Sequence, residues 1–174
     1  AARERMKALL DEELAEAVRF TSAAVSRLST VIDGMLRLSR AGRFELRPQV
    51  VDVRSVVTKV LDSLHATLSE LGVSLVVENL PPCWGDAAAV EQVFANLLDN
   101  AIKYLDPSRP GVIVIGSRQE NAGPGSPPVY FVRDNGVGIA EADREMIFLP
   151  FQRAKGNKAE GEGIGLAVVR RIVE

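Results

Sequence analysis

The stretch NLLDNAIKY, residues 96–104, places polar side chains that can bind phosphate and metal on an apolar helix. Asn96, Asn100 and Lys103 are spaced by four and three residues, so a helix presents them on one face. An asparagine on an apolar face is costly unless its amide is paired. Amide oxygens suit Mg²⁺, and an ammonium group suits phosphate. The stretch therefore indicates a polar ligand, although asparagines that make ordinary caps are the alternative.

A second stretch, DNGVGI at residues 134–139, follows directly on an expected strand. The Asp134 carboxylate can accept a hydrogen bond from an exocyclic amine, which favours adenine over guanine. Gly136 and Gly138 let the backbone come close to a flat ligand. Taken alone, the stretch is also typical of a simple Asn-Gly turn.

The third and fourth stretches lie near the end of the chain. In IFLPFQRAK, Phe148 and Phe151 flank a proline, and we expect them to anchor a lid to the core. The stretch GEGIGLA opens an apolar helix, whose N-terminal N–H groups attract phosphate oxygens. A flexible turn before a helix is the alternative. Between the two stretches lie candidate charge donors of a lid: Arg153, Lys155 and Lys158.

The elements that position these residues are predicted from periodicity. Residues 11–41 read as one long helix with a heptad seam of Leu14, Val18, Thr21, Val25, Leu28, Ile32 and Met35. This helix either lies on its own domain or forms one arm of a dimeric bundle. We therefore expect a helical region over residues 1–45 and a second domain over residues 46–174.

The second domain is predicted to alternate helices and strands. Asp52 and Asp86 are expected N-caps of helices that end near residues 71 and 105. Strands are expected at 73–80, 111–119 and 129–134, a turn at 81–85, loops after residue 135, and a last helix at 165–174. The connector over residues 42–52 has room for a small strand. This order predicts an α+β fold, a two-layer α/β sandwich with helices on one sheet face.

Composition excludes several classes of function. The 174 residues are 47% hydrophobic and carry a net charge of −2, so no strong field favours nucleic acid. The single cysteine, Cys83, cannot form an internal disulfide, which fits a cytoplasmic location. No apolar run is long enough to cross a bilayer, so membrane attachment is expected only through parts outside this chain.

In their order and spacing, the four stretches resemble the N, G1, F and G2 boxes of the sensor histidine kinases of two-component systems. The segment STVIDGMLRLSRAGRFELRPQVVDV is similar to the second dimerisation helix and connector of that family. LSRAGR and FLPFQR look closest to the phytochrome-type kinases. The resemblance implies the Bergerat-type, or GHKL, ATP-binding fold and a homodimer formed through the helical region.

The resemblance also implies a ligand, Mg-ATP, and roles for residues. Asn100 would hold Mg²⁺, with Asn96 as a second candidate ligand, and Lys103 would contact phosphate. Asp134 would accept the adenine amine, and Tyr104 would flank the nucleotide. The other expected ATP-binding residues are Gly136, Gly138, Ile139, Phe148, Arg153, Lys155, Lys158, Gly161, Gly163, Ile164, Gly165 and Leu166.

The chain departs from the family in two ways. The acceptor-histidine box is absent, and the one histidine, His65, is expected to be a partly buried helix residue. The γ-phosphoryl would then pass to a histidine outside this chain and onward to an aspartate of a response regulator. The family also has two strands after the last helix, so we expect the natural protein to continue beyond Glu174.

Two other functions remain open from the sequence. A nucleotide-binding pseudokinase would act through its partners without phosphotransfer. A related GHKL ATPase would hydrolyse ATP with a glutamate near the start of the N-box helix, where Glu91 lies.

Overall fold

The computed structural model describes parts of residues 13–36 and all of residues 47–119, 126–152 and 163–174. The chain divides into two units, Ala1–Arg37 and Leu38–Glu174. The boundary predicted between residues 45 and 46 lies outside the described residues. The described part of the first unit is α-helical, as predicted. The apolar side chains of its heptad seam are exposed: Leu14, Val18, Val25, Leu28, Ile32 and Met35.

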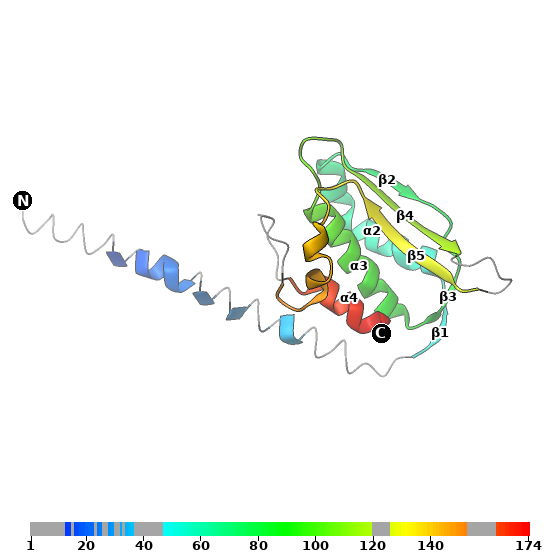
Figure 1. Cartoon of the computed structure of the whole chain (residues 1–174), viewed down its shortest axis with the longest axis horizontal. Coiled ribbons are helices and arrows are strands. Elements are labelled where there is room, and N and C mark those ends of the chain that lie inside the picture. Colours follow the sequence, from blue (N-terminus) through cyan, green and yellow to red (C-terminus); the bar gives the residue numbers. More distant parts are fainter. Residues whose placement is uncertain are drawn as a thin grey trace, which may run out of the picture. The chain divides into compact units, whose positions relative to one another are not determined.

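The second unit is built on a three-stranded sheet in the order β2-β4-β5 (Figure 1). Strand β2 (Ser74–Val77) runs parallel to β4 (Val112–Gln119), and β5 (Pro128–Asp134) runs antiparallel to it. All three strands lie where the sequence predicts them. Because Asp134 pairs with Ile113, the carboxylate predicted to bind a ligand lies at the end of the sheet.

Two helices, α2 (Val53–Glu70) and α3 (Ala87–Lys103), cover one face of the sheet, and α4 (Gly165–Val173) packs against α3 (Figure 1). The predicted N-caps are confirmed: Asp52 accepts from the Ser55 N–H group and Asp86 from those of Ala88 and Ala89. The core joins both helices to the sheet through Val53, Val57, Val60, Leu68, Leu80, Phe94, Leu98, Ala101, Ile113 and Ile115. The predicted α+β sandwich is therefore confirmed.

The turn predicted over residues 81–85 was wrong in part, because β3 (Cys83–Gly85) pairs there with β1 (Gln49–Val51) in an antiparallel ribbon. Three residues are too few for an alternating pattern, and the two prolines before them signal a turn. The small strand allowed for in the connector is β1. Two short 3₁₀ helices, η1 (Glu141–Asp143) and η2 (Met146–Phe148), lie in the region predicted as loop.

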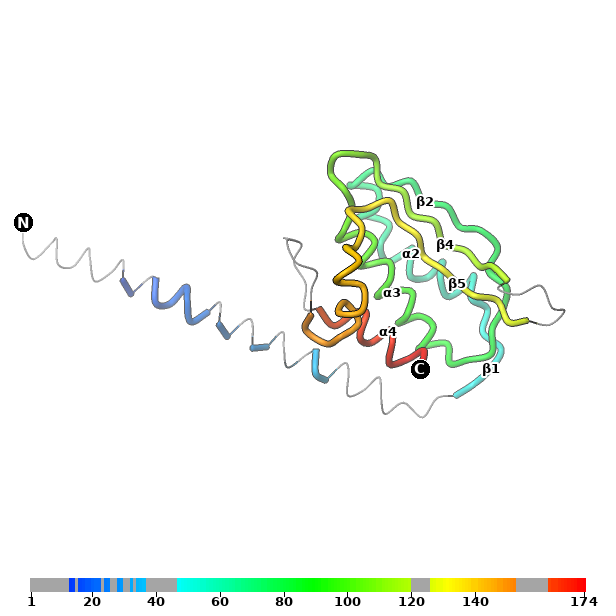
Figure 2. Tube along the Cα trace, in the orientation of Figure 1, coloured from blue at the N-terminus to red at the C-terminus, as the bar shows by residue number. Residues whose placement is uncertain are grey.

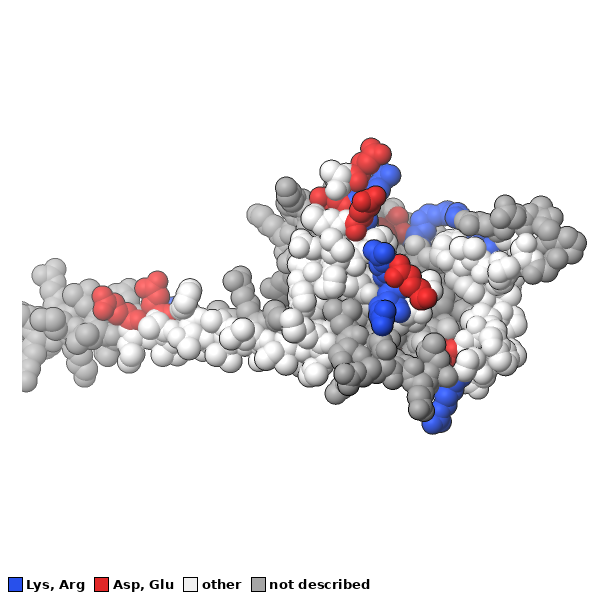
Figure 3. Space-filling view, turned by 60° about the horizontal axis from the view of Figure 1, so that its bottom comes forward, with Lys and Arg blue, Asp and Glu red and all other residues white. Residues whose placement is uncertain are grey.

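Charge on the second unit is mixed in sign. On the face shown in Figure 3, acidic and basic side chains stand beside one another rather than in a patch of one sign. This agrees with the net charge of −2 for the sequence. Among the described residues, no helix is long and apolar enough to cross a membrane.

Candidate functional site

The candidate site begins where the middle of α3 meets the start of α4. A Cβ atom placed on Gly165 would lie 3.2 Å from Asn96 Oδ1 and 3.6 Å from Asn100 Nδ2. Glycine at this position therefore lets the α4 N-terminus approach both amides closely. Residues almost 70 positions apart in sequence, from the first and fourth stretches, are brought together here.

The two amides differ in how they are paired. Asn96 Nδ2 donates to the Gln92 carbonyl at 2.8 Å, so its Oδ1 atom is the one near Gly165. Asn100 Nδ2 is buried and has no hydrogen-bond partner within the described part of the chain. An unpaired buried donor costs about 1–3 kcal/mol. A ligand that accepts a hydrogen bond at this point would remove that cost.

The start of α4 offers backbone donors beside these amides. No side chain caps the helix, and Ile164, its buried N-cap residue, accepts from the Val168 N–H group at 2.9 Å. The first N–H groups of a helix have no partner within the helix and attract anions. Leu166, in the first turn, is half-buried. Two amides and a helix N-terminus thus form a site suited to phosphate and a hard cation.

The turn after β5 packs against the end of α3, as the chain trace in Figure 2 shows. Asp134 Oδ1 accepts from the Gly136 N–H group at 2.9 Å, and Val137 N–H donates to the Tyr104 carbonyl at 3.0 Å. Gly138 has a φ of +73° and open space where a Cβ would be, and Ile139 beside it is exposed. The predicted adenine-binding turn is therefore joined to the helix that carries Asn100.

Lys103 lies on α3 but is already paired. Its ammonium group contacts Asp99 Oδ2 at 2.6 Å, and both side chains are well exposed. Exposed pairs of this kind contribute little to stability and exchange readily. The predicted contact between Lys103 and phosphate stays a prediction.

The segment predicted as a lid lies between two residues that are hydrogen-bonded to each other. Phe151 N–H donates to the Gly163 carbonyl at 2.9 Å. Phe148 and Phe151 are 37% and 38% exposed, so the prediction that they anchor the segment in the core was wrong. Four predicted ligand residues lie outside the described part: Arg153, Lys155, Lys158 and Gly161.

Two residues weighed for other roles lie away from the amides. Glu91 pairs with Lys59 of α2 at 2.7 Å, and it is nine residues from Asn100, about 180° around the helix. This position does not favour Glu91 as a base that activates water at the site. His65 is exposed on α2, so the expectation of partial burial was wrong.

Sequence reasoning missed residues that hold the site together. Arg109 and the side chain of Asn135 bind backbone groups more than 20 residues away. Such contacts leave no periodic signal.

Among the described residues there is no cluster of three or more His, Cys, Asp or Glu side chains that could hold a metal.

Comparison with known proteins places this chain in one family. A model of the family described as histidine kinase-, DNA gyrase B-, and HSP90-like ATPase matches residues 85–174. Cyanobacterial phytochrome B of Nostoc sp. strain PCC 7120 is 36% identical over 166 residues, which are 94% of this chain and 21% of that protein. The signal transduction histidine-protein kinase/phosphatase MprB of Mycobacterium sp. strain KMS is 30% identical over 167 residues, 95% of this chain and 31% of that protein.

The fold is also found among solved structures. Full-length ShkA, solved in complex with AMPPNP, matches with a TM-score of 0.65 and 25% identity, over 83% of this chain and 30% of that chain. This chain spans less than a third of each of these proteins. It belongs to the family of histidine kinase-, DNA gyrase B- and HSP90-like ATPases, and within that family it is related to the sensor histidine kinases of two-component systems.

Proposed function

We propose that this chain binds Mg-ATP and is the catalytic portion of a sensor histidine kinase. The observation that carries the proposal is the convergence of Asn96 and Asn100 on Gly165 at the uncapped N-terminus of α4. This arrangement supplies donors for phosphate oxygens and amide oxygens for a cation. The complex of ShkA with AMPPNP, an analogue of ATP, supports the same class of ligand.

The adenine end of the site is assigned to the turn after β5. One oxygen of Asp134 accepts from Gly136 N–H, which leaves the second oxygen to accept from the 6-amino group of adenine. The open space at Gly138 and the exposed Ile139 leave room for a flat ring. Tyr104, at the end of α3, would flank the nucleotide.

The residues present also fit Mg²⁺. Asn96 Oδ1 is a hard oxygen. The buried Nδ2 atom of Asn100 has no hydrogen-bond partner within the described residues, so no bond of that atom opposes a rotation of the amide that would present its oxygen to the ion. Mg²⁺ commonly takes few protein ligands and shares its coordination with substrate phosphates, which fits a site built from amides. When bound, the ion would supply charge neutralisation for the phosphates. Asn100 would be its main protein ligand and Asn96 a second.

The reaction proposed is phosphoryl transfer to a histidine outside this chain. The bond between the γ-phosphorus and the β–γ bridging oxygen breaks, and a bond from phosphorus to an imidazole nitrogen forms, which releases ADP. The phosphoryl group would then pass to an aspartate of a response regulator. Within this chain, α3 and the start of α4 hold the phosphates, so catalysis is mainly positioning. The relatives that are named as histidine kinases support this reaction class.

The helical unit is assigned to dimerisation. Six apolar residues of its heptad seam are exposed, and a second copy of the same helix would cover them. Replacing Val18 and Val25 with glutamate should convert a dimer into a monomer in analytical ultracentrifugation. A monomeric parent chain at high concentration would contradict this part of the proposal.

We place the protein in the cytoplasm, where ATP and response regulators are found.

Calorimetric titration of ATP, with and without Mg²⁺, tests the proposed site. The parent chain should bind ATP more tightly with Mg²⁺, and Asn100→Ala and Asp134→Ala should each weaken binding by at least about tenfold. Matched controls are Asn79→Ala and Asp62→Ala, which change exposed residues away from the site. A parent chain that is folded by circular dichroism but does not bind ATP would overturn the proposal. In the full-length protein, Asn100→Ala should abolish histidine phosphorylation.

A further inference from the structure

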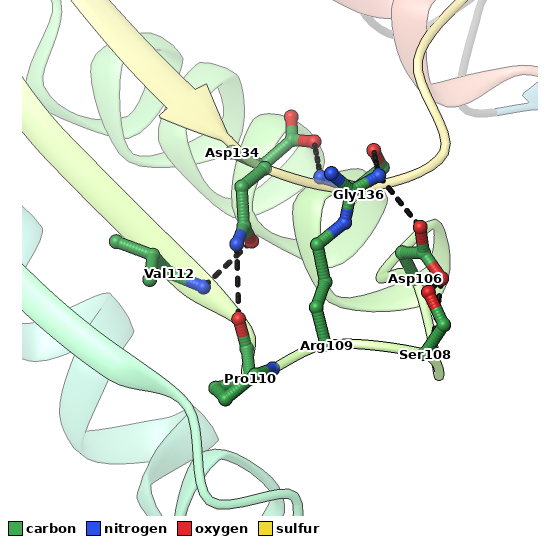
Figure 4. A network of polar contacts seen from close by, with 8 residues as sticks. Asp106, Ser108, Arg109, Pro110, Val112, Asp134 and Gly136 are labelled. Carbon is green, nitrogen blue, oxygen red and sulfur yellow. Dashed lines mark hydrogen bonds and ion pairs between the residues drawn. The ribbon is translucent and has the colours of Figure 1, made fainter.

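We infer that Arg109 and Asn135 are positioning residues that set the place of Asp134 and so determine selectivity for adenine. The inference rests on the proposed function, because it assumes that Asp134 accepts the adenine amine. Neither residue belongs to the set expected from the sequence to touch the nucleotide. They act through the turn that carries Asp134, which Figure 4 shows in detail.

Arg109 holds the third residue of the turn. Its Nη2 atom donates to the Gly136 carbonyl at 3.3 Å and also pairs with Asp106 Oδ2 at 2.6 Å. Asp106 is held in turn by the N–H and hydroxyl groups of Ser108, at 2.9 and 2.6 Å. These hydrogen bonds, led by that of the Ser108 hydroxyl, lower the pKa of Asp106, so it stays charged at neutral pH. The guanidinium group is therefore held where it can donate to the Gly136 carbonyl.

Asn135 is the second residue of the turn, and its side chain binds the turn to the backbone of the α3–β4 connection. Its Oδ1 atom accepts from the Val112 N–H group at 2.8 Å, and its Nδ2 atom donates to the Pro110 carbonyl at 2.9 Å. Both partners lie where the α3–β4 connection enters β4. Since one donor and one acceptor are matched, the orientation of the amide is defined. Both polar atoms of the Asn135 side chain are thus hydrogen-bonded to backbone groups.

Asp134 depends on both contacts. Its Oδ1 atom accepts from Gly136 N–H, while Arg109 binds the carbonyl of the same glycine. The carboxylate is exposed, so packing does not fix it. The two fixed neighbours therefore determine where its second oxygen points. A displacement of even about 1 Å weakens a directional contact to a ligand strongly.

The connection from residue 104 to residue 111 also begins at the end of α3. Val137 N–H binds the carbonyl of Tyr104, which follows the helix turn of Asn100. The network therefore sets the spacing between the adenine end and the phosphate end of the site. Loss of Arg109 or Asn135 should change recognition of the base more than recognition of the phosphates.

The test compares ATP with purine riboside 5′-triphosphate, which lacks the 6-amino group and keeps the ring and phosphates. In the parent chain, ATP should bind more tightly than this analogue by about tenfold. Arg109→Ala and Asn135→Ala should each reduce that ratio by about threefold to tenfold. Affinity for the analogue should change by less than about twofold. Arg109→Lys keeps the charge and should restore part of the ratio.

Arg54→Ala is the matched control. Arg54 Nη2 also donates to a backbone carbonyl, that of Glu78, at 2.8 Å, but away from the turn. The variant should lose a similar contact without changing the ratio of the affinities for ATP and for the analogue. Urea unfolding of every variant shows whether the fold is kept, and Arg109→Lys serves as the folded test if Arg109→Ala unfolds.

The outcomes separate the two proposals. If the folded parent chain does not bind ATP, both the proposed function and this inference are wrong. If it binds ATP and the analogue equally, Asp134 does not recognise the amine and the inference is wrong. If the ratio is large but is unchanged in Arg109→Ala and Asn135→Ala, the inference alone is overturned. Only a reduced ratio with intact analogue binding supports it.

Discussion

The carbonyl oxygen of Tyr104 occupies the space that a side chain on Gly136 would need. A Cβ atom at Gly136 would also lie 2.8 Å from Asp134 Oδ1 and 2.9 Å from the Tyr104 carbonyl carbon. The neighbours are backbone and a carboxylate that bonds the same glycine, so they have little freedom to move. The end of α3 and the turn after β5 therefore touch through a contact that only glycine allows.

Gly136→Ala should lower the free energy of unfolding by at least about 2 kcal/mol, because the turn must shift to relieve the overlap. ATP binding should be lost with it, since Asp134 moves with the turn. Urea unfolding and calorimetry measure the two effects. Gly85→Ala is the control, because a Cβ there meets nothing closer than 3.8 Å. Equal stability of the two variants would show that the contact is looser than described.

Asn100→Ala should have opposite effects on stability and binding. The change removes a buried donor that lacks a partner in the described part of the chain, and alanine favours a helix by about 0.5 kcal/mol more than asparagine. Without nucleotide, the variant should be more stable than the parent by about 1 kcal/mol, while affinity for Mg-ATP falls. Asn96→Ala should raise the free energy of unfolding by less, because the Nδ2 atom of Asn96 already donates to the Gln92 carbonyl. A destabilised Asn100→Ala variant would show that the residue serves the fold rather than a ligand.

Much of this architecture could be predicted from the sequence, since its signals are local. The caps Asp52 and Asp86 precede helices with regular apolar spacing, and the strands of the main sheet are short stretches rich in valine and other apolar residues. The convergence of Asn96 and Asn100 with Gly165 was expected only because the stretches resemble known boxes. Helical spacing shows that two asparagines share a face, but it does not show what faces them.

What sequence reasoning missed depends on contacts between distant residues. The ribbon of β1 and β3 pairs Val50 with Trp84, and each strand alone is too short to be recognised. The bond from Arg109 to Gly136 spans 27 residues. The partial exposure of Phe148 and Phe151 was missed for a related reason: an aromatic type suggests burial, whereas the tertiary position decides it.

Gly163→Ala should weaken the hydrogen-bonded contact between Phe151 and Gly163. Gly163 has a φ of +70°, and a Cβ there would lie 2.8 Å from the Gln152 carbonyl oxygen. Backbone strain costs about 1 kcal/mol, and the overlap adds to it. Gly72→Ala is the matched control, since Gly72 has a φ of +61° but open space around its Cβ position. Urea unfolding should show a larger loss in the free energy of unfolding for Gly163→Ala than for Gly72→Ala. Equal losses would show that the backbone around Gly163 is packed less closely than described.

The cap of α3 should make stability depend on pH in the acid range. Asp86 accepts from the backbone N–H groups of Arg47, Ala88 and Ala89, and these bonds, led by that of Arg47, lower its pKa. A carboxylate with a lowered pKa stabilises the fold above its unfolded pKa of about 3.9. That stability is lost as the pH falls through the lower pKa of the folded state.

Asp86→Asn keeps an oxygen that can cap the helix but does not titrate, so it isolates the charged contribution. The advantage of the parent over Asp86→Asn should be constant from pH 7 to about pH 5 and should decline below about pH 4. The decline should stay under about 1 kcal/mol, because the residue is only half-buried and solvent screens part of its charge. Urea unfolding at a series of pH values measures it, with Asp62→Asn on α2 as a control for net charge. An advantage that grows as the pH falls would have the wrong sign and would show that the cap does not favour the charged form.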